Sequence, residues 1–251
     1  MMKYTFIMLL IVHVLGDFYF QTDKMAQNKK ENFKWVVGHS LIYAMISFVM
    51  IYIFVPGIPK EVAFVFVISH GFIDIVKYVI CNHKYLKKKG VLIEHKTVFI
   101  VDQMIHIFVI LTITYYLSEY QLENLYNSHI KSIFSLFGLS GSFTLSWIIK
   151  ILLMHKPANI LIANILEKYK PYEKLSNDIN SKSAGRFIGT LERIIMTIFI
   201  TINQYSAVGL VLTAKSIARY NKISDDPEFA EYYLLGTLLS TLCAISVSII
   251  F

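Results

Sequence analysis

Long apolar stretches constrain the fold of this 251-residue chain more than any other feature of its sequence. A helix that crosses the roughly 30 Å hydrocarbon core of a bilayer needs about 20 apolar residues, because each residue advances the helix by about 1.5 Å. Stretches of that length, bounded by Lys, Pro or polar clusters, cover residues 4–22, 35–55, 61–82, 97–117 and 133–154. The sequence therefore predicts an all-α fold, a polytopic integral membrane helical bundle.

The second half of the chain decides the number of crossings. The apolar run 186–219 is too long for one span, but it divides at Asn203 and Gln204 into a short helical hairpin. A final span covers residues 229–251. This interpretation gives about eight transmembrane helices, whereas a single tilted helix over 186–219 gives seven.

A polar stretch separates the last clear span from the hairpin. Within it, residues 157–169 group apolar side chains with lysines at one end, which is typical of a helix at the membrane interface. An ordinary packed connector explains the pattern equally well. We therefore expect a four-helix membrane bundle over residues 1–117, and further membrane helices with a cytoplasmic amphipathic connector over residues 118–251.

The positive charge of the chain lies mostly in the loops between apolar stretches. The formal net charge is +7, from 24 Lys and Arg against 17 Asp and Glu. Because the lysines flank hydrophobic segments, we expect the lipid bilayer and its anionic headgroups as partners, and no nucleic acid. Loops rich in Lys and Arg face the cytoplasm, so both termini of an eight-span chain should lie outside. The cytoplasmic loops would hold Lys24, Lys29, Lys30 and Lys34, and then Lys84, Lys87, Lys88, Lys89 and Lys96.

Ionisable side chains inside the first four apolar stretches are the strongest functional signal. A charged group in hydrocarbon is costly unless it faces the bundle interior and finds a partner, so such a group indicates function by default. The four stretches contain, in order, His13, Asp17 and Gln21; His39; His70, Asp74 and Lys77; and Asp102, Gln103 and His106.

The spacing of these residues predicts that they meet. Three His/Asp pairs are separated by four positions, which places both members of a pair on one helix face. Successive spans alternate in direction, and this alternation puts all four sets in the cytoplasmic half of the membrane. The sequence therefore predicts one intramembrane polar site. The pairs are His13 with Asp17, His70 with Asp74, and Asp102 with His106.

The residue types in this site favour a divalent metal. Neutral imidazoles and carboxylates are ligands suited to zinc, manganese or iron. Lys77 lies one turn beyond Asp74 and is placed to neutralise it; with Gln21 and Gln103, it would orient substrate or balance charge. A proton or ion pathway and purely structural hydrogen bonding between helices stay open. The predicted metal ligands are His13, Asp17, His39, His70, Asp74, Asp102 and His106.

A second group of charged residues lies in the second half of the chain. Under the hairpin interpretation these residues fall near the cytoplasmic boundary, where mutual ion pairing is the simplest account. A basic pocket for a lipid phosphate or another anionic headgroup is the functional alternative. The group consists of Glu192, Arg193, Lys215, Arg219 and Glu231.

Three segments carry a resemblance to a known family. They read His13-Val-Leu-Gly-Asp-Phe-Tyr-Phe-Gln21, Ser69-His-Gly-Phe-Ile-Asp-Ile-Val-Lys77 and Asp102-Gln-Met-Ile-His106. These segments resemble a bacterial inner-membrane protein family catalogued as domain of unknown function 3307. The resemblance implies a protein of the bacterial inner (cytoplasmic) membrane, and it implies no reaction. A looser similarity, in helical His and Asp ligands only, is to membrane-bound metal-dependent hydrolases.

These features leave three functional hypotheses. A metal site can activate water, so the first is a metal-dependent hydrolase of a membrane-associated phosphate or ester. The second is a transporter of protons or metal ions, for which broken helices should appear; Gly16 and Gly71 are the nearest candidates. The third is a non-catalytic membrane scaffold, which should tolerate apolar replacements of the polar residues.

Overall fold

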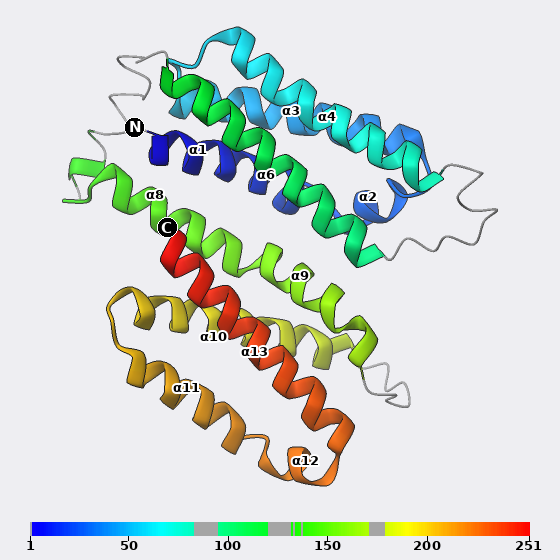
Figure 1. Cartoon of the computed structure of the whole chain (residues 1–251), viewed down its shortest axis with the longest axis vertical. Coiled ribbons are helices and arrows are strands. Elements are labelled where there is room, and N and C mark those ends of the chain that lie inside the picture. Colours follow the sequence, from blue (N-terminus) through cyan, green and yellow to red (C-terminus); the bar gives the residue numbers. More distant parts are fainter. Residues whose placement is uncertain (1, 83–94, 120–131, 133, 137, 171–178) are drawn as a thin grey trace. The chain divides into compact units, whose positions relative to one another are not determined.

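The chain is helical throughout the part that the structure describes (Figure 1). The structure is a computed structural model, and it describes residues 2–82, 95–119, 132, 134–136, 138–170 and 179–251. The predicted all-α fold is therefore confirmed. The chain divides into two compact units, Met1–Ile149 and Lys150–Phe251. The predicted boundary after residue 117 stays a prediction.

Among the described residues, six helical segments are long and apolar enough to cross a membrane, which indicates an integral membrane protein. The eight predicted crossings would also need both helices of the hairpin. Its second helix, α11 (Tyr205–Ile217), has 13 residues and spans about 20 Å, less than the roughly 30 Å of hydrocarbon. The number eight therefore stays a prediction. The six segments are Met2–Tyr19, Phe33–Phe54, Lys60–Asn82, Thr97–Glu119, Gly141–Tyr169 and Pro227–Ile250.

The first unit arranges long helices around a short central one. The central helix is α1 (Met2–Val14), and it packs against α3 (Phe33–Phe54) and α6 (His95–Glu119). The helix α4 (Lys60–Asn82) packs against α3 and α6 in turn. Residues 7–14 of α1 are all buried, as expected of a helix that is apolar on nearly every side.

The outer helices of this unit expose large apolar side chains. Leu41 on α3, Ile68 on α4 and Phe108 on α6 are 66%, 64% and 69% exposed. Such surfaces would be unfavourable in water, but lipid tails solvate them at no cost. The outward faces of α3, α4 and α6 are therefore suited to contact with lipid.

The connection from α1 to α3 folds back onto the first unit. After a π-helical turn, η1 (Leu15–Tyr19), the chain enters the short helix α2 (Asp23–Asn28), which Thr22 precedes as the N-cap residue. The Oγ1 atom of Thr22 caps α2 by accepting a hydrogen bond from the backbone N–H of Met25 at 3.2 Å. The Met25 side chain is buried. This anchored connection carries Lys29 back toward the polar residues of α4.

In the second unit, α10 (Ile179–Thr201) packs against α13 (Pro227–Ile250). The helix α8 (Gly141–Met154) leads through His155 into α9 (Lys156–Leu166), which packs against both α10 and α13. The 3-10 turn η2 (Glu167–Tyr169) follows directly. The predicted interfacial connector corresponds to α9 and η2, and its depth in the membrane stays a prediction. The buried core of this unit contains Met154, Met196 and Ala244.

The hairpin breaks where the sequence predicts. The helix α10 ends at Thr201 and α11 begins at Tyr205. Asn203 adopts a left-handed backbone conformation with a φ of 59°, which asparagine tolerates better than most residues. The short helix α12 (Tyr220–Asp225) then leads to α13, where Asp226 Oδ1 accepts the backbone N–H of Phe229 at 3.0 Å.

Candidate metal centre

All seven predicted ligand residues are buried inside the first unit. The helices that carry them are far apart in the sequence but packed together in space (Figure 1). The arrangement places a group of ionisable side chains where solvent does not reach them. The contributing elements are α1 and η1 (His13 and Asp17), α3 (His39), α4 (His70 and Asp74) and α6 (Asp102 and His106).

A π-helical turn carries Asp17. In η1 the backbone N–H of Phe20 donates to the carbonyl of Leu15, five residues earlier, at 2.9 Å. Such turns are rare and occur frequently at functional sites. The turn also brings Gly16 against an aromatic ring, because a Cβ atom on Gly16 would lie 2.4 Å from Tyr43 Cδ2. A side chain at position 16 would therefore collide with Tyr43.

Tyr43 connects this turn to His70. The Tyr43 side chain is 1% exposed, and its ring stacks on the His70 imidazole with 3.5 Å between centroids and 17° between planes. The stacking fixes the orientation of the imidazole. The sequence alone does not reveal the role of Tyr43, because an aromatic residue in an apolar span has no feature that separates it from ordinary core residues.

Three ligand atoms form a nearly equilateral triangle. Asp17 Oδ1 lies 3.1 Å from His39 Nε2 and 3.2 Å from His70 Nε2. The two Nε2 atoms lie 3.2 Å from each other. Metal–nitrogen distances of about 2.0–2.1 Å in tetrahedral zinc sites place two ligand atoms about 3.3 Å apart. The three atoms thus have the mutual spacing of ligands around a single ion.

A second group of potential ligand atoms shares Asp17 with the first. His13, Asp17 and His106 offer atoms within 4.8 Å of one another. His13 Nε2 lies 3.9 Å from Asp17 Oδ2, the oxygen that the first triangle does not use. The His13 and His106 rings stack with 5.0 Å between centroids. Asp17 therefore presents one oxygen to each group.

The hydrogen bonds of two imidazoles determine which nitrogen has a free lone pair. His106 Nδ1 lies 2.8 Å from the carbonyl of Asp102, and a carbonyl only accepts, so Nδ1 is the protonated nitrogen. By the same reasoning His13 Nε2 donates to Gln103 Oε1 at 3.3 Å. The remaining nitrogens, His106 Nε2 and His13 Nδ1, are buried without a hydrogen-bond partner among the described residues. Unprotonated buried nitrogens of this kind are suited to hold a ligand.

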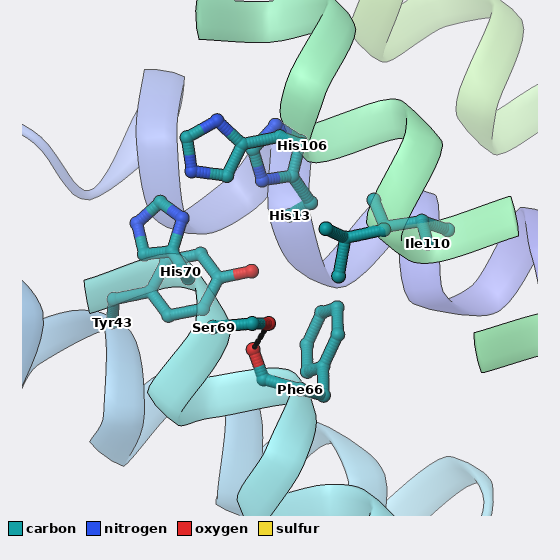
Figure 2. Close-up of a pocket in the computed structure, with 8 residues that line it drawn as sticks. His13, Tyr43, Phe66, Ser69, His70, His106 and Ile110 are labelled. Carbon is teal, nitrogen blue, oxygen red and sulfur yellow. Dashed lines mark hydrogen bonds between the residues drawn. The ribbon is translucent and has the colours of Figure 1, made fainter. Parts of the chain in front are cut away.

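A small cavity adjoins these imidazoles. It has a volume of about 10 Å³ and is lined by His13, His70 and His106 together with apolar residues such as Ile110. Figure 2 shows the three imidazole rings gathered around this space, with Phe66 and Ile110 also bordering it. A volume of about 10–15 Å³ holds one water molecule. The polar cluster therefore has room for one small ligand beside its imidazoles.

Two lysines neutralise the remaining carboxylates. Lys29 Nζ lies 2.7 Å from Asp74 Oδ2, and Lys77 Nζ lies 3.0 Å from Asp74 Oδ1 and 2.8 Å from Asp102 Oδ2. Neither Asp74 nor Asp102 belongs to the two groups of potential metal ligands found among the described residues. The structure thus separates the seven predicted ligands into five grouped ligand residues and two carboxylates that pair with lysine.

Lys29 is a charged residue of the site that the sequence does not reveal. The sequence predicts only a loop lysine at this position, because its separation of 45 residues from Asp74 follows no helical period. The side chain also donates to Gln21 Oε1 at 3.0 Å. The position of Lys29 follows from the fold of the connection through α2, which no local pattern reveals.

Gln103 links the carboxylates to the imidazoles. Its Nε2 group donates to Asp17 Oδ2 at 3.2 Å and lies 3.4 Å from Asp102 Oδ2. Its Oε1 atom accepts from His13 Nε2. The Gln103 amide therefore orients both Asp17 and His13, in the way that groups behind metal ligands hold those ligands in place.

Among the described residues of the second unit, an ion pair joins two of the five predicted cluster residues. Lys215 Nζ lies 2.6 Å from Glu192 Oε2. Arg193 is 2% exposed and donates elsewhere, to Met154 O at 3.0 Å and Asn159 Oδ1 at 2.7 Å. Arg219 and Glu231 are exposed. The anionic-headgroup pocket therefore stays a prediction.

Comparison with known proteins identifies a family. A family model described as "Protein of unknown function (DUF3307)" matches residues 5–134 of the chain. The matched range contains every residue of the His/Asp cluster and both lysines that pair with it. No curated protein and no solved structure matches the chain.

Proposed function

This chain belongs to the family described as "Protein of unknown function (DUF3307)", and we propose that its first unit is a membrane metal-dependent hydrolase. In this proposal the His/Asp cluster binds a divalent transition metal, and the substrate is a membrane-associated phosphate or ester. The ligand residues are His13, Asp17, His39, His70 and His106, with Gln103 holding two of them in position.

The triangle of Asp17, His39 and His70 carries this proposal. Two imidazole N–H groups that donate to the same carboxylate oxygen would satisfy the distances to Asp17, but they would place two donor nitrogens, His39 Nε2 and His70 Nε2, only 3.2 Å from each other. A cation at the triangle replaces the Nε2 protons, because metal binding requires neutral imidazoles and releases protons. Nitrogen and carboxylate ligands suit zinc, manganese or iron.

The charges of the cluster also favour a cation. With neutral imidazoles, three carboxylates (Asp17, Asp74 and Asp102) face two lysines (Lys29 and Lys77), which leaves one negative charge inside the unit. An uncompensated charge in a medium of low dielectric is costly. A divalent ion removes this negative charge and leaves the cluster with one positive charge.

A bound ion would supply Lewis acidity and a water of lowered pKa. The side chains around it have separate tasks. Asp17 presents one oxygen to each ligand group, and Gln103 fixes the orientation of the Asp17 and His13 side chains. Lys77 offers an ammonium group to an anionic substrate. The apolar residues around the cluster exclude bulk water, which strengthens each electrostatic interaction.

Transport of protons or metal ions is the second candidate function, and the π-helical turn favours it. Transporters bind ions where membrane helices depart from regular α-helix, and Asp17 lies in such a departure. A liposome assay distinguishes the two functions. A transporter moves protons or metal ions across the bilayer, whereas the hydrolase retains its ion and turns over a lipid phosphate or ester.

The proposal includes a location. We place the cluster in the cytoplasmic half of a bacterial inner membrane, with both termini outside, because Lys24, Lys30 and Lys34 follow the polar end of the first span. The second lysine-rich loop, residues 84–89, lies outside the described residues. Labelling of single cysteines at the termini from either side of the membrane tests this orientation.

Metal analysis of the detergent-purified protein tests the site. We expect about one or two equivalents of a transition metal in the wild type and none in His39→Gln or His70→Gln. Asp102→Asn is the matched control, because it changes a buried carboxylate outside the two ligand groups and should keep the metal. A wild-type protein without metal, or His39→Gln and His70→Gln proteins with wild-type metal content, would refute the assignment.

A further inference from the structure

A large apolar groove lies between α4 and α6, on the first unit. Its volume is about 350 Å³, and its apolar lining includes Val76 and Ile80 on α4 and Val101 and Ile105 on α6. Pockets for small molecules have volumes of about 300–1,000 Å³. The four side chains are 38%, 48%, 48% and 44% exposed, so the groove is open on the face that lipid would contact.

Two charged side chains interrupt this apolar lining. Lys77 and Asp102 line the groove, and they form an ion pair of 2.8 Å. The Lys77 side chain is 29% exposed, whereas that of Asp102 is 5% exposed. The accessible charge in the groove is therefore the ammonium group.

The same lysine connects the groove to the His/Asp cluster. Lys77 Nζ lies 3.0 Å from Asp74 Oδ1, and Asp74 Oδ2 lies 3.4 Å from His39 Nε2. A ligand whose polar group reaches Lys77 is thus one carboxylate away from the metal-ligand triangle. A ligand in the groove must combine a long apolar part with a polar group beside Lys77.

We propose that this groove binds an acyl chain of an anionic lipid, with the lipid phosphate at Lys77. A hydrocarbon chain matches the lining and would enter sideways from the bilayer. The phosphate matches the positive charge that the cluster acquires when a divalent ion binds. The inference rests on the proposed function, because without the ion the cluster has a net negative charge that repels phosphate.

A substitution in the groove and a matched substitution outside it test this inference. Val101→Trp fills the groove, whereas Leu111→Trp enlarges a residue on the same helix that does not line the groove. The wild-type exposures are nearly equal, 48% for Val101 and 49% for Leu111. Both proteins would be purified with their metal content measured on the same samples.

The probe is phosphatidic acid with a photoactivatable acyl chain, incorporated in neutral-lipid vesicles with the protein. We expect capture on residues 72–81 and 97–105, about tenfold lower capture in Val101→Trp, and wild-type capture in Leu111→Trp. The same photoactivatable chain on diacylglycerol, which has no phosphate, should give about tenfold less capture.

Equal capture in the two tryptophan variants would overturn the inference, because it indicates only the lipid that surrounds any membrane protein. The phosphate assignment would be overturned by a different result, in which Val101→Trp abolishes capture but phosphatidic acid and diacylglycerol are captured equally. Failure of the proposed metal site appears separately, as a wild-type protein without metal.

Discussion

The two units of this protein bury charge in opposite ways. In the second unit, every nitrogen of the Arg193 guanidinium donates to a neutral oxygen, from Met154, Asn159, Thr190 or Ser240. In the first unit, nitrogens of all four clustered histidines stay buried without a partner among the described residues. Saturated hydrogen bonding is typical of a group that holds helices together. Unsatisfied groups beside a cavity indicate a place for a ligand.

This difference predicts different effects of substitution. A residue that organises a saturated network should cost folding stability when it is removed. Removal of a residue from an unsatisfied network should weaken ligand binding, with little effect on the stability of the ligand-free protein. Each unit has its own reporter of unfolding, because Cys81 lies in the first unit and Cys243 in the second.

The largest effect is expected for Arg193→Met. The substitution leaves the carbonyl of Met154 and the side chains of Asn159 and Ser240 without their donor inside the unit, so the second unit should lose about 3 kcal/mol or more of stability. Thiol labelling of Cys243 during titration with sodium dodecyl sulfate, located by peptide mass spectrometry, measures the change. Labelling of Cys81 should stay at the wild-type level.

Lys215→Met is the matched control for this substitution. It removes a charge from the same unit, but the ion pair of Lys215 with Glu192 is partly exposed, with side-chain exposures of 21% and 14%. Pairs of this kind contribute up to about 1 kcal/mol. Equal destabilisation by Lys215→Met and Arg193→Met would remove the distinction between a saturated network and a simple ion pair.

An intermediate effect is expected for Gln103→Leu. Loss of the amide leaves His13 and Asp17 without the group that orients them. Substitution of residues that hold metal ligands in place typically lowers metal affinity by about 10- to 100-fold. Competition with a chelating fluorophore measures the affinity. Thr112→Val on the same helix serves as control, because its hydroxyl group donates only to Phe108 O. Unchanged affinity in Gln103→Leu would show that Gln103 does not position the ligands.

The smallest effect on stability is expected for Asp17→Asn without metal. Asparagine still accepts a hydrogen bond from His39 or His70 through its side-chain oxygen, so the stability should change by less than about 1 kcal/mol. Bound metal should be lost completely. Labelling of Cys81 and metal analysis measure the two effects. A large destabilisation of metal-free Asp17→Asn would show that the cluster stabilises the fold, as the Arg193 network does, and would contradict the proposed difference between the two units.

The sequence was sufficient to predict which residues of the first four helices face inward. The four-residue spacing of pairs such as His13 with Asp17 follows the helical period, and the alternation of the spans fixes their common depth. These two rules need no tertiary information. They therefore predicted the burial of the polar residues, whereas the lengths of the apolar stretches predicted the helical fold and the break of the hairpin beside Asn203.

Contacts between segments distant in sequence could not be predicted in this way. The position of Lys29 depends on how the connection through α2 folds, and the partners of Arg193 come from α8, α9, α10 and α13. The stacking of Tyr43 on His70 depends on side-chain packing alone. For the same reason, spacing did not separate Asp17, which lies between imidazoles, from Asp74, which lies between lysines.

The π-helical turn at Leu15–Tyr19 separates the direction in which Asp17 points from the packing of the helix that precedes it. Each residue rotates an α-helix by about 100°, so removal of Leu15 or Gly16, which precede Asp17 in the turn, would rotate Asp17 away from His39 and His70 while residues 7–14 kept their buried surface. A single deletion would thus remove Asp17 from the polar cluster and leave the packing of the helical bundle intact. Length variation at this one turn is therefore a mark by which relatives with and without the centre could be told apart.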